Sequence, residues 1–330
     1  MPATSTYIIG VDLGGTNLVV GAMPADGSRE IGVHALPTRA KLGADAVVDR
    51  ICEMIETTIA AVIAETGATR ADIAGVGIGA PGPLDRAKGL VIVTPNLGWT
   101  NFPLRDRVAD QVGLVATLDN DANCATLGEW WLGAAKGARN VVGFTLGTGI
   151  GGGLILDGKL YHGASDVAGE IGHMTIDSAG RRCKCGNYGC LEAYASGPAI
   201  AERAREALSG GERSALAGMC GGDLSTLTAA TVYQASKNGD AVASDVVRET
   251  ARILGVGVAN MLNVFNPDVV VLAGGVAQAG DSLFVPLRAE VSRRAFKPAV
   301  DACRIVPGAL GGSAGMVGAV AAFLADHPVE

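Results

Sequence analysis

The stretch YIIGVDLGGTNLVVGA, residues 7–22, decides the kind of fold this chain can form. An apolar run meets Asp12-Leu13-Gly14-Gly15-Thr16 and continues into a second apolar run, Leu18 to Ala22. This pattern predicts a strand, a glycine turn and a second strand. Nucleotide-binding folds of the Rossmann and P-loop types place a helix after their glycines, and no helical periodicity follows Thr16. The stretch therefore predicts a β-hairpin.

The turn of this hairpin carries groups that suit phosphate and a divalent cation. Asp12 supplies a carboxylate at a strand end, Gly14 and Gly15 let backbone N–H groups approach an anion, and Thr16 adds a hydroxyl. A β-hairpin also needs glycine for purely conformational reasons, so the motif alone leaves both interpretations open.

The same pattern recurs where the apolar strand Val141 to Leu146 runs into GTGIGGG, residues 147–153, and then into Leu154 to Leu156. A chain of 330 residues is too long for one ordinary domain. Two glycine-rich hairpins therefore predict two related α/β lobes, with both turns directed into the cleft between them.

Further elements follow from hydrophobic spacing and from glycine and proline stops. We expect helices over 45–66, 245–265 and 313–324, the last begun by Gly311-Gly312, and core strands over 73–78, 114–118 and 269–272. The strand over 269–272 leaves Gly274-Gly275 at its carboxyl end.

The charge of the chain argues against a nucleic-acid partner. The formal net charge is −7, and no cluster of Lys and Arg is visible. Arg29 is the first basic residue, which speaks against a signal peptide, and no apolar run approaches the length of a membrane span. We expect a cytoplasmic protein without membrane or nucleic-acid partners.

Asn120 and Asp121 follow the expected strand 114–118. The amide could bind sugar hydroxyls as donor and acceptor, and the carboxylate could accept the proton of an attacking hydroxyl. Asn and Asp also form ordinary turns, which is the simpler interpretation of this local sequence.

A cysteine cluster lies shortly after Glu170 and His173. Three thiols and one imidazole form a four-ligand set typical of closed zinc sites: His173, Cys183, Cys185 and Cys190, with Glu192 two residues beyond. Free or redox-active thiols are the alternative. The remaining cysteines, Cys52, Cys124, Cys220 and Cys303, are expected to be small buried apolar residues.

Taken in order, these motifs resemble the ROK family of sugar kinases and repressors, which shares the actin and hexokinase fold. The resemblance covers nearly the whole chain and rests on residues 12–16, 147–153, 170–173 and 183–192. It implies a two-lobed α/β ATPase fold with two glycine-rich hairpin phosphate loops. It also implies a discontinuous smaller lobe, 1–119 plus 311–330, and a larger lobe, 120–310, that carries the zinc cluster.

The resemblance also implies a role for each matching position. Magnesium is matched to Asp12, and the ATP and phosphate contacts to Asp12, Gly14, Gly15, Thr16, Gly147, Thr148 and Gly149, with Gly274, Gly275 and the turn at Gly311-Gly312 on the adenosine side. Sugar binding is matched to Asn96, Asn120, Asp121, Glu170, His173 and Glu192, with Asp121 as the catalytic base.

The stretch Thr94 to Trp99 is most similar to the glucokinase branch, which implies phosphoryl transfer from MgATP to the 6-hydroxyl of glucose. N-acetylhexosamine and other hexose kinases share most of these contacts, and polyphosphate is another donor used in the family. Family members are often dimers or tetramers. A repressor would need a DNA-binding unit ahead of Asp12, where eleven residues stand, and a silent scaffold would not need Asp121, Glu170 and Glu192.

Overall fold

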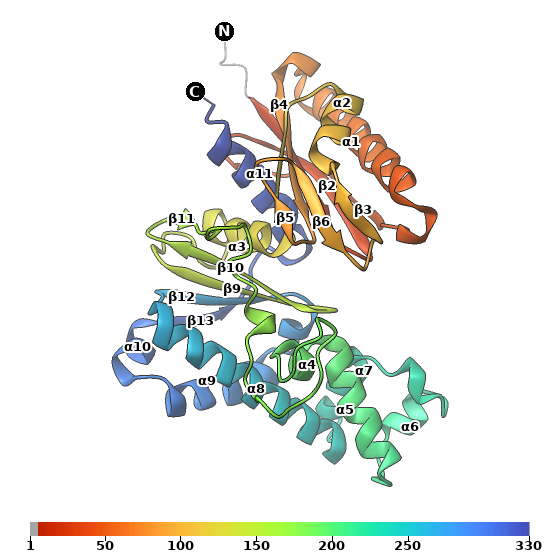
Figure 1. The fold of residues 1–330 in the computed structure, drawn as a ribbon, viewed down its shortest axis with the longest axis vertical. Helices are drawn as coiled ribbons and strands as arrows, with labels where there is room; N and C mark the ends of the chain where they lie inside the picture. Colours follow the sequence, from red (N-terminus) through yellow and green to blue (C-terminus); the bar gives the residue numbers. More distant parts are fainter. Residues whose placement is uncertain (1–5, 330) are drawn as a thin grey trace.

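The computed structural model describes residues 6–329, which form two lobes, each built on a five-stranded mixed sheet (Figure 1). The first sheet has the order β3-β2-β1-β4-β8. It contains β1 (Tyr7–Leu13), β2 (Asn17–Pro24), β3 (Ile31–Pro37), β4 (Ile73–Ala80) and β8 (Ala116–Asn120). The strands β1, β2 and β3 are antiparallel neighbours, whereas β4 and β8 continue the sheet in parallel.

The second sheet repeats this arrangement with the order β11-β10-β9-β12-β13. It contains β9 (Val141–Leu146), β10 (Ile150–Leu156), β11 (Lys159–Leu160), β12 (Val269–Ala273) and β13 (Arg304–Pro307). Here too a hairpin, β9–β10, is extended in parallel on its other side by β12 and β13. The predicted pair of hairpins and the internal repeat are therefore confirmed.

The helices cover these sheets, and a small third sheet is formed by β5 (Leu84–Asp85), β6 (Leu90–Thr94) and β7 (Trp99–Phe102). The first lobe has α1 (Ala44–Thr66) and α2 (Leu104–Val112). The second has α4 (Glu192–Ala195), α5 (Gly197–Ser209), α6 (Leu216–Met219), α7 (Ala229–Lys237), α8 (Ala241–Phe265), α9 (Asp281–Arg294) and α10 (Lys297–Ala302). Each lobe buries its own large apolar core.

The expected elements exist, but several boundaries differ. The helix expected at 245–265 begins four residues earlier as α8, because the Asp240 side chain accepts a hydrogen bond from the Ala243 N–H and caps it there. The strand expected at 114–118 is β8 and ends at Asn120. The helix expected at 45–66 is α1, which begins at Ala44.

Two helices, α3 (Asp121–Trp131) and α11 (Ala314–Asp326), cross between the sheets (Figure 1). A Cβ at Gly318 of α11 would run into the backbone carbonyl of Cys124 on α3, so the crossing requires glycine. The helix α11 also packs Met316, Val320 and Phe323 against the first sheet. This packing supports the proposed discontinuous lobe of 1–119 plus 311–330, whose residues 1–5 and 330 lie outside the described part.

The scattered cysteines do not all behave as expected. Cys52 and Cys124 are buried, but Cys220 and Cys303 are partly exposed, so the expectation was wrong for the latter pair. Both pack against the margin of the second core, directly after the short helices α6 and α10. Among residues 6–329, no helix combines the length and apolar character needed to cross a membrane.

Candidate active site

A cleft of about 930 Å³ lies between the two hairpin turns. It collects side chains and backbone from both lobes, although these residues are spread from 12 to 313 in the sequence. Its lining includes most of the predicted site residues: Asp12, Gly14, Gly15, Thr16, Asn96, Asn120, Asp121, Gly147, Thr148, Gly149, Glu170, His173, Glu192 and Gly274.

The first turn is held in shape by a residue that local sequence did not indicate. The Gly14 N–H donates to the Asn17 carbonyl at 2.8 Å, which closes the turn. The buried Thr38 then donates its hydroxyl to the Gly14 carbonyl at 2.7 Å and its N–H to the Thr16 carbonyl at 2.8 Å. Thr38 follows β3, so its role appears only once β2 and β3 are paired.

Asp12 lies beside a second carboxylate. Burial, and then the negative charge of Asp121, raises the pKa of Asp12 to about 7. Two buried carboxylates without a neighbouring cation repel one another, and a bound divalent metal ion would relieve that repulsion. The donor chemistry at Asp12 therefore fits magnesium. Residue 315, at the start of α11, is glycine, and a Cβ at this position would clash with the Asp12 carboxylate.

Asn120 and Asp121 occupy the junction between β8 and α3. The Asn120 Oδ1 accepts from the N–H groups of Ala122 at 2.9 Å and Asn123 at 3.2 Å, so Asn120 is the N-cap of α3. The expectation that this amide offers donor and acceptor together to a sugar therefore needs correction, because its oxygen is occupied. Its Nδ2 group remains to face the cleft.

Asp121 has the properties of a proton acceptor. Burial, and to a smaller extent the charge of Glu170, raises its pKa to about 6, although hydrogen bonds such as that from the Ala122 N–H act in the opposite direction. A carboxylate with a pKa near the working pH accepts a proton well and is still mostly ionised.

The second turn is connected to the segment that follows the cysteines. The Gly147 N–H donates to the Gly149 carbonyl at 3.0 Å, and Glu192 Oε2 accepts from the Ile150 N–H at 2.9 Å. A Cβ at Gly149 would lie 2.5 Å from that carboxylate oxygen, so a larger residue at this position would displace the Glu192 side chain. Glu192 thus has one oxygen occupied by the second hairpin, a contact that local sequence did not indicate.

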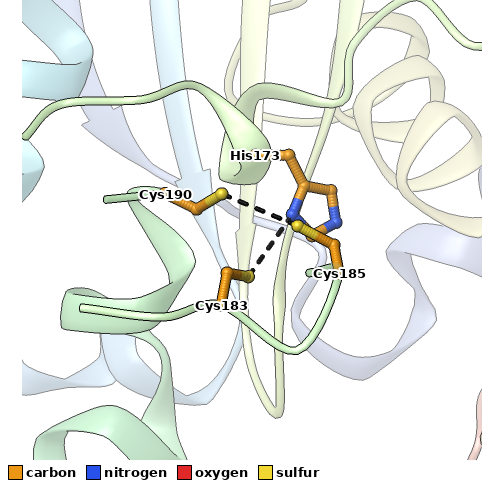
Figure 2. A group of neighbouring side chains, drawn as sticks. All are labelled: His173, Cys183, Cys185 and Cys190. Atoms are coloured by element: carbon orange, nitrogen blue, oxygen red, sulfur yellow. Dashed lines mark hydrogen bonds between the residues drawn. The ribbon is translucent and has the colours of Figure 1, made fainter. Parts of the chain in front are cut away.

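The predicted zinc ligands come together in space. The four ligand atoms of His173, Cys183, Cys185 and Cys190 all lie within 4.8 Å of one another (Figure 2). Cys185 Sγ and Cys190 Sγ are 3.7 Å apart, and Cys183 Sγ lies 3.8 Å from His173 Nδ1. Ligands about 2.3 Å from a tetrahedral zinc are separated by about 3.8 Å, so this arrangement fits the metal.

His173 belongs to both the cluster and the cleft. Its Nδ1 faces the thiols (Figure 2). The same residue also lines the cleft between the lobes. Metal ligation through Nδ1 would leave Nε2 as the N–H donor.

A second cavity of about 650 Å³ adjoins the cleft, and Gly147 and Thr148 line both. Gly275 lies in this second cavity, whereas Gly274 and Gly312 line the main cleft. The second cavity also contains residues that sequence reasoning missed, among them Tyr233 and Gln234 on α7. No local motif marks them, because they are ordinary positions of an amphipathic helix.

Comparison with known proteins agrees with this geometry. The model of the ROK family matches residues 8–326. A glucokinase of Halalkalibacterium halodurans is 36% identical over 313 residues, which cover 94% of this chain and 93% of the relative. A crystal structure of a ROK family glucokinase from Streptomyces griseus, in complex with glucose and AMPPNP, has a TM-score of 0.82 and 35% identity, covering 96% of this chain and 98% of that one.

A repressor is also similar. The xylose repressor of Caldicellulosiruptor bescii is 32% identical over 286 residues, 87% of this chain and 71% of the relative. The match to the Streptomyces griseus structure over almost the full chain confirms the predicted two-lobed α/β ATPase fold of the actin and hexokinase type.

Proposed function

The chain belongs to the ROK family, and we propose that it is a glucokinase that transfers the γ-phosphoryl group of MgATP to the 6-hydroxyl of glucose. One observation carries the proposal. Asp121, whose pKa is raised to about 6, lines a single cleft together with a glycine turn from each lobe. In a loose phosphoryl-transfer transition state, catalysis needs positioned phosphates and an acceptor for the hydroxyl proton, and this cleft can supply both.

We assign the sugar to the side of the cleft formed by the segments around Asn96, Asn120, Glu170, His173 and Glu192. Asp121 would accept the proton of the 6-hydroxyl as the phosphoryl group arrives. The Nδ2 group of Asn120 and the Nε2 group of His173 would donate to ring hydroxyls. Glu170, with no side-chain hydrogen bond among the described residues, is free to accept from them.

The nucleotide would extend from the cleft into the second cavity. Gly147 and Thr148 line both spaces, so phosphates bound at this turn can continue to an adenosine held against Gly275 and Tyr233. Asp12 would hold magnesium, which neutralises phosphate charge when it is bound. On the opposite side, Gly14, Gly15 and Thr16 would contact the transferred phosphoryl group.

We also propose that His173, Cys183, Cys185 and Cys190 hold a structural zinc ion, which supplies a crosslink and no reaction step. Closure of the lobes 1–119 plus 311–330 and 120–310 would exclude water from the phosphoryl group. We further propose that the protein forms a homodimer or homotetramer. It would work in the cytoplasm, where ATP is available.

A coupled ATP-consumption assay tests the function. The panel is glucose, mannose, N-acetylglucosamine, N-acetylmannosamine, allose and fructose, and we expect the highest kcat/KM with glucose. Polyphosphate in place of ATP tests the donor. A higher kcat/KM with an N-acetylhexosamine would redirect the substrate assignment, and no phosphorylation of any sugar would contradict the kinase activity itself.

A further inference from the structure

A second group of polar side chains gathers at the end of β8, and its members line neither the cleft nor the cysteine cluster. Its centre is Asp119, which is only 1% exposed. Asp119 Oδ1 accepts from the Asn120 N–H at 2.7 Å and from Asn123 Nδ2 at 3.1 Å. Its Oδ2 lies 2.7 Å from His162 Nε2 and 2.9 Å from Arg86 Nε.

These partners come from distant parts of the chain. Arg86 lies in the turn between β5 and β6 of the first lobe, whereas His162 follows β11 of the second lobe. Asp119 is the residue before Asn120, at the end of β8. The carboxylate therefore joins the strand end that carries Asn120 and Asp121 to a loop of the opposite lobe.

The loop joined in this way leads directly to Glu170. The His162 carbonyl accepts from the Ala168 N–H at 3.1 Å, which closes the loop on itself. Within it, Asp166 Oδ2 accepts from the Arg86 N–H at 3.0 Å. The His162 contact with Asp119 and the Asp166 contact with Arg86 both reach the first lobe, so the path from His162 to Glu170 is held at two points by that lobe.

The side chain of Asp119 is ionised in this environment. Burial opposes its ionisation, but the hydrogen bond from His162 and the charge of Arg86 hold its pKa below the ordinary value. A buried carboxylate is stable only while its partners remain, because an uncompensated charge in a protein interior is costly. Loss of His162 would therefore leave the carboxylate with Arg86 as its remaining charged partner and would remove one of the two contacts that hold the loop.

We propose that Asp119 and His162 are positioning residues that keep the base Asp121 and the sugar-binding Glu170 in register across the lobe boundary. The inference rests on the proposed function. Asp119 touches neither reacting group, and acts through the backbone of Asn120 and the side chain of Asn123, both in the junction that presents Asp121. His162 acts through the loop that ends at Glu170.

A purely structural crosslink would affect stability and leave the kinetic constants of the folded enzyme unchanged. A positioning pair should instead change glucose parameters selectively, because Glu170 and Asp121 face the sugar, while the turn at Gly147 to Gly149 is held by other contacts. The division between glucose and ATP parameters therefore separates the two roles.

The test uses a matched pair of substitutions in the full chain. His162→Met and His162→Gln are similar in length, but only glutamine keeps an N–H donor for Asp119. We expect His162→Met to lose roughly ten- to a hundred-fold in kcat/KM for glucose, with the KM for ATP within about twofold of wild type. His162→Gln should restore most of that loss. Ser165→Ala, exposed on the same loop, is the control and should behave as wild type.

A double-mutant cycle tests whether Asp119 and His162 act through the same contact. Asp119→Asn and His162→Met should each lower kcat/KM for glucose, and the double variant should lose less than the product of the two losses, because both remove one interaction. Circular dichroism and Tm establish that each variant is folded.

Failure of the positioning role can be distinguished from failure of the proposed function. An active wild type with equal glucose kcat/KM in folded His162→Met and His162→Gln would overturn the positioning role alone. A wild type that phosphorylates no sugar would overturn the proposed function, and this inference with it. If His162→Met does not fold, the folded Asp119→Asn decides: unchanged glucose kcat/KM would overturn the inference.

Discussion

The segment from His162 to His173 is held at its two ends by two different kinds of contact. At its carboxyl end, His173 meets three cysteines that all lie between residues 183 and 190. At its amino end, His162 meets Asp119, with Arg86 as the third member, so the partners come from separate regions of the chain. Glu170 lies between these two supports and faces the cleft.

The two supports differ in what makes them stable. The cysteine cluster has the ligand spacing of a tetrahedral zinc site, so its strength would come from metal coordination. The Asp119 group instead depends on compensation of one buried carboxylate by an imidazole and a guanidinium. The short segment to which we assign sugar binding would thus be held by a local chemical crosslink at one end and by a long-range ionic contact at the other.

The largest effect should come from substitution of Asp121, because neither the cysteine cluster nor the Asp119 group can supply the missing base. Asp121→Asn should fold and bind glucose, but lose roughly 10²- to 10⁴-fold in kcat, the usual loss for a general base. Steady-state kinetics and glucose calorimetry measure both quantities. Asp110→Asn, an exposed position on α2, serves as the control. A folded variant that keeps more than about half of wild-type kcat would show that Asp121 is not the base.

Removal of the carboxyl-end support should have the next largest effect. Zinc-free protein, or Cys185→Ser, should bind glucose roughly ten- to a hundred-fold more weakly, because the Nε2 donor of His173 is no longer fixed. The KM for ATP should change less, since Asp12 and the turn at Gly147 to Gly149 are outside the cluster. Metal analysis followed by calorimetry of metal-replete and chelated samples is the measurement.

The control for this experiment is matched circular dichroism of the two samples. Unchanged glucose affinity in verified zinc-free protein would mean that the cluster is a distant crosslink. In that case the Asp119 group would be the support that matters for the sugar.

A fall in pH should protonate the base Asp121 while the contact between Asp119 and His162 persists. Because burial raises the pKa of Asp121 to about 6, protonation removes the base as the pH falls, and kcat/KM should drop roughly tenfold for each unit below that value. The pKa of Asp119 is held low, so its contact should persist over the same range. Rates and glucose affinity are measured from pH 7.5 to 5.5.

A rate that stays flat from pH 7.5 to 5.5 would speak against Asp121 as the titrating base. A parallel loss of glucose affinity would instead indicate that the supports, and not only the base, respond to acid.

The smallest effect should come from a cysteine outside both supports. Cys303 is partly exposed and lies next to β13, away from the four candidate ligands. Cys303→Ala should therefore leave zinc content and the KM for glucose unchanged within about twofold. Metal analysis and sugar kinetics check this, and a lower zinc content would show that the cluster has been assigned incorrectly.

Features whose signal is local could be predicted from the amino-acid sequence alone. The two hairpins, the core strands and the grouping of cysteines follow from apolar spacing, glycine turns and ligand spacing within short stretches, and the structure confirms each of them. The roles of the site residues, Asp121 as base above all, stay predictions, although these residues do meet in one cleft.

The contacts by which these stretches support one another could not be predicted from local sequence and are seen in the folded chain. The Asp119 contact with His162 and Arg86, the bond from the Ile150 N–H to Glu192, and the cavity beside α7 join residues with no shared motif. Asn120 illustrates the limit, since its type suited a sugar ligand but its oxygen caps α3. Local spacing encodes turns and ligand sets, whereas long-range pairs exist only where packing brings distant backbone together.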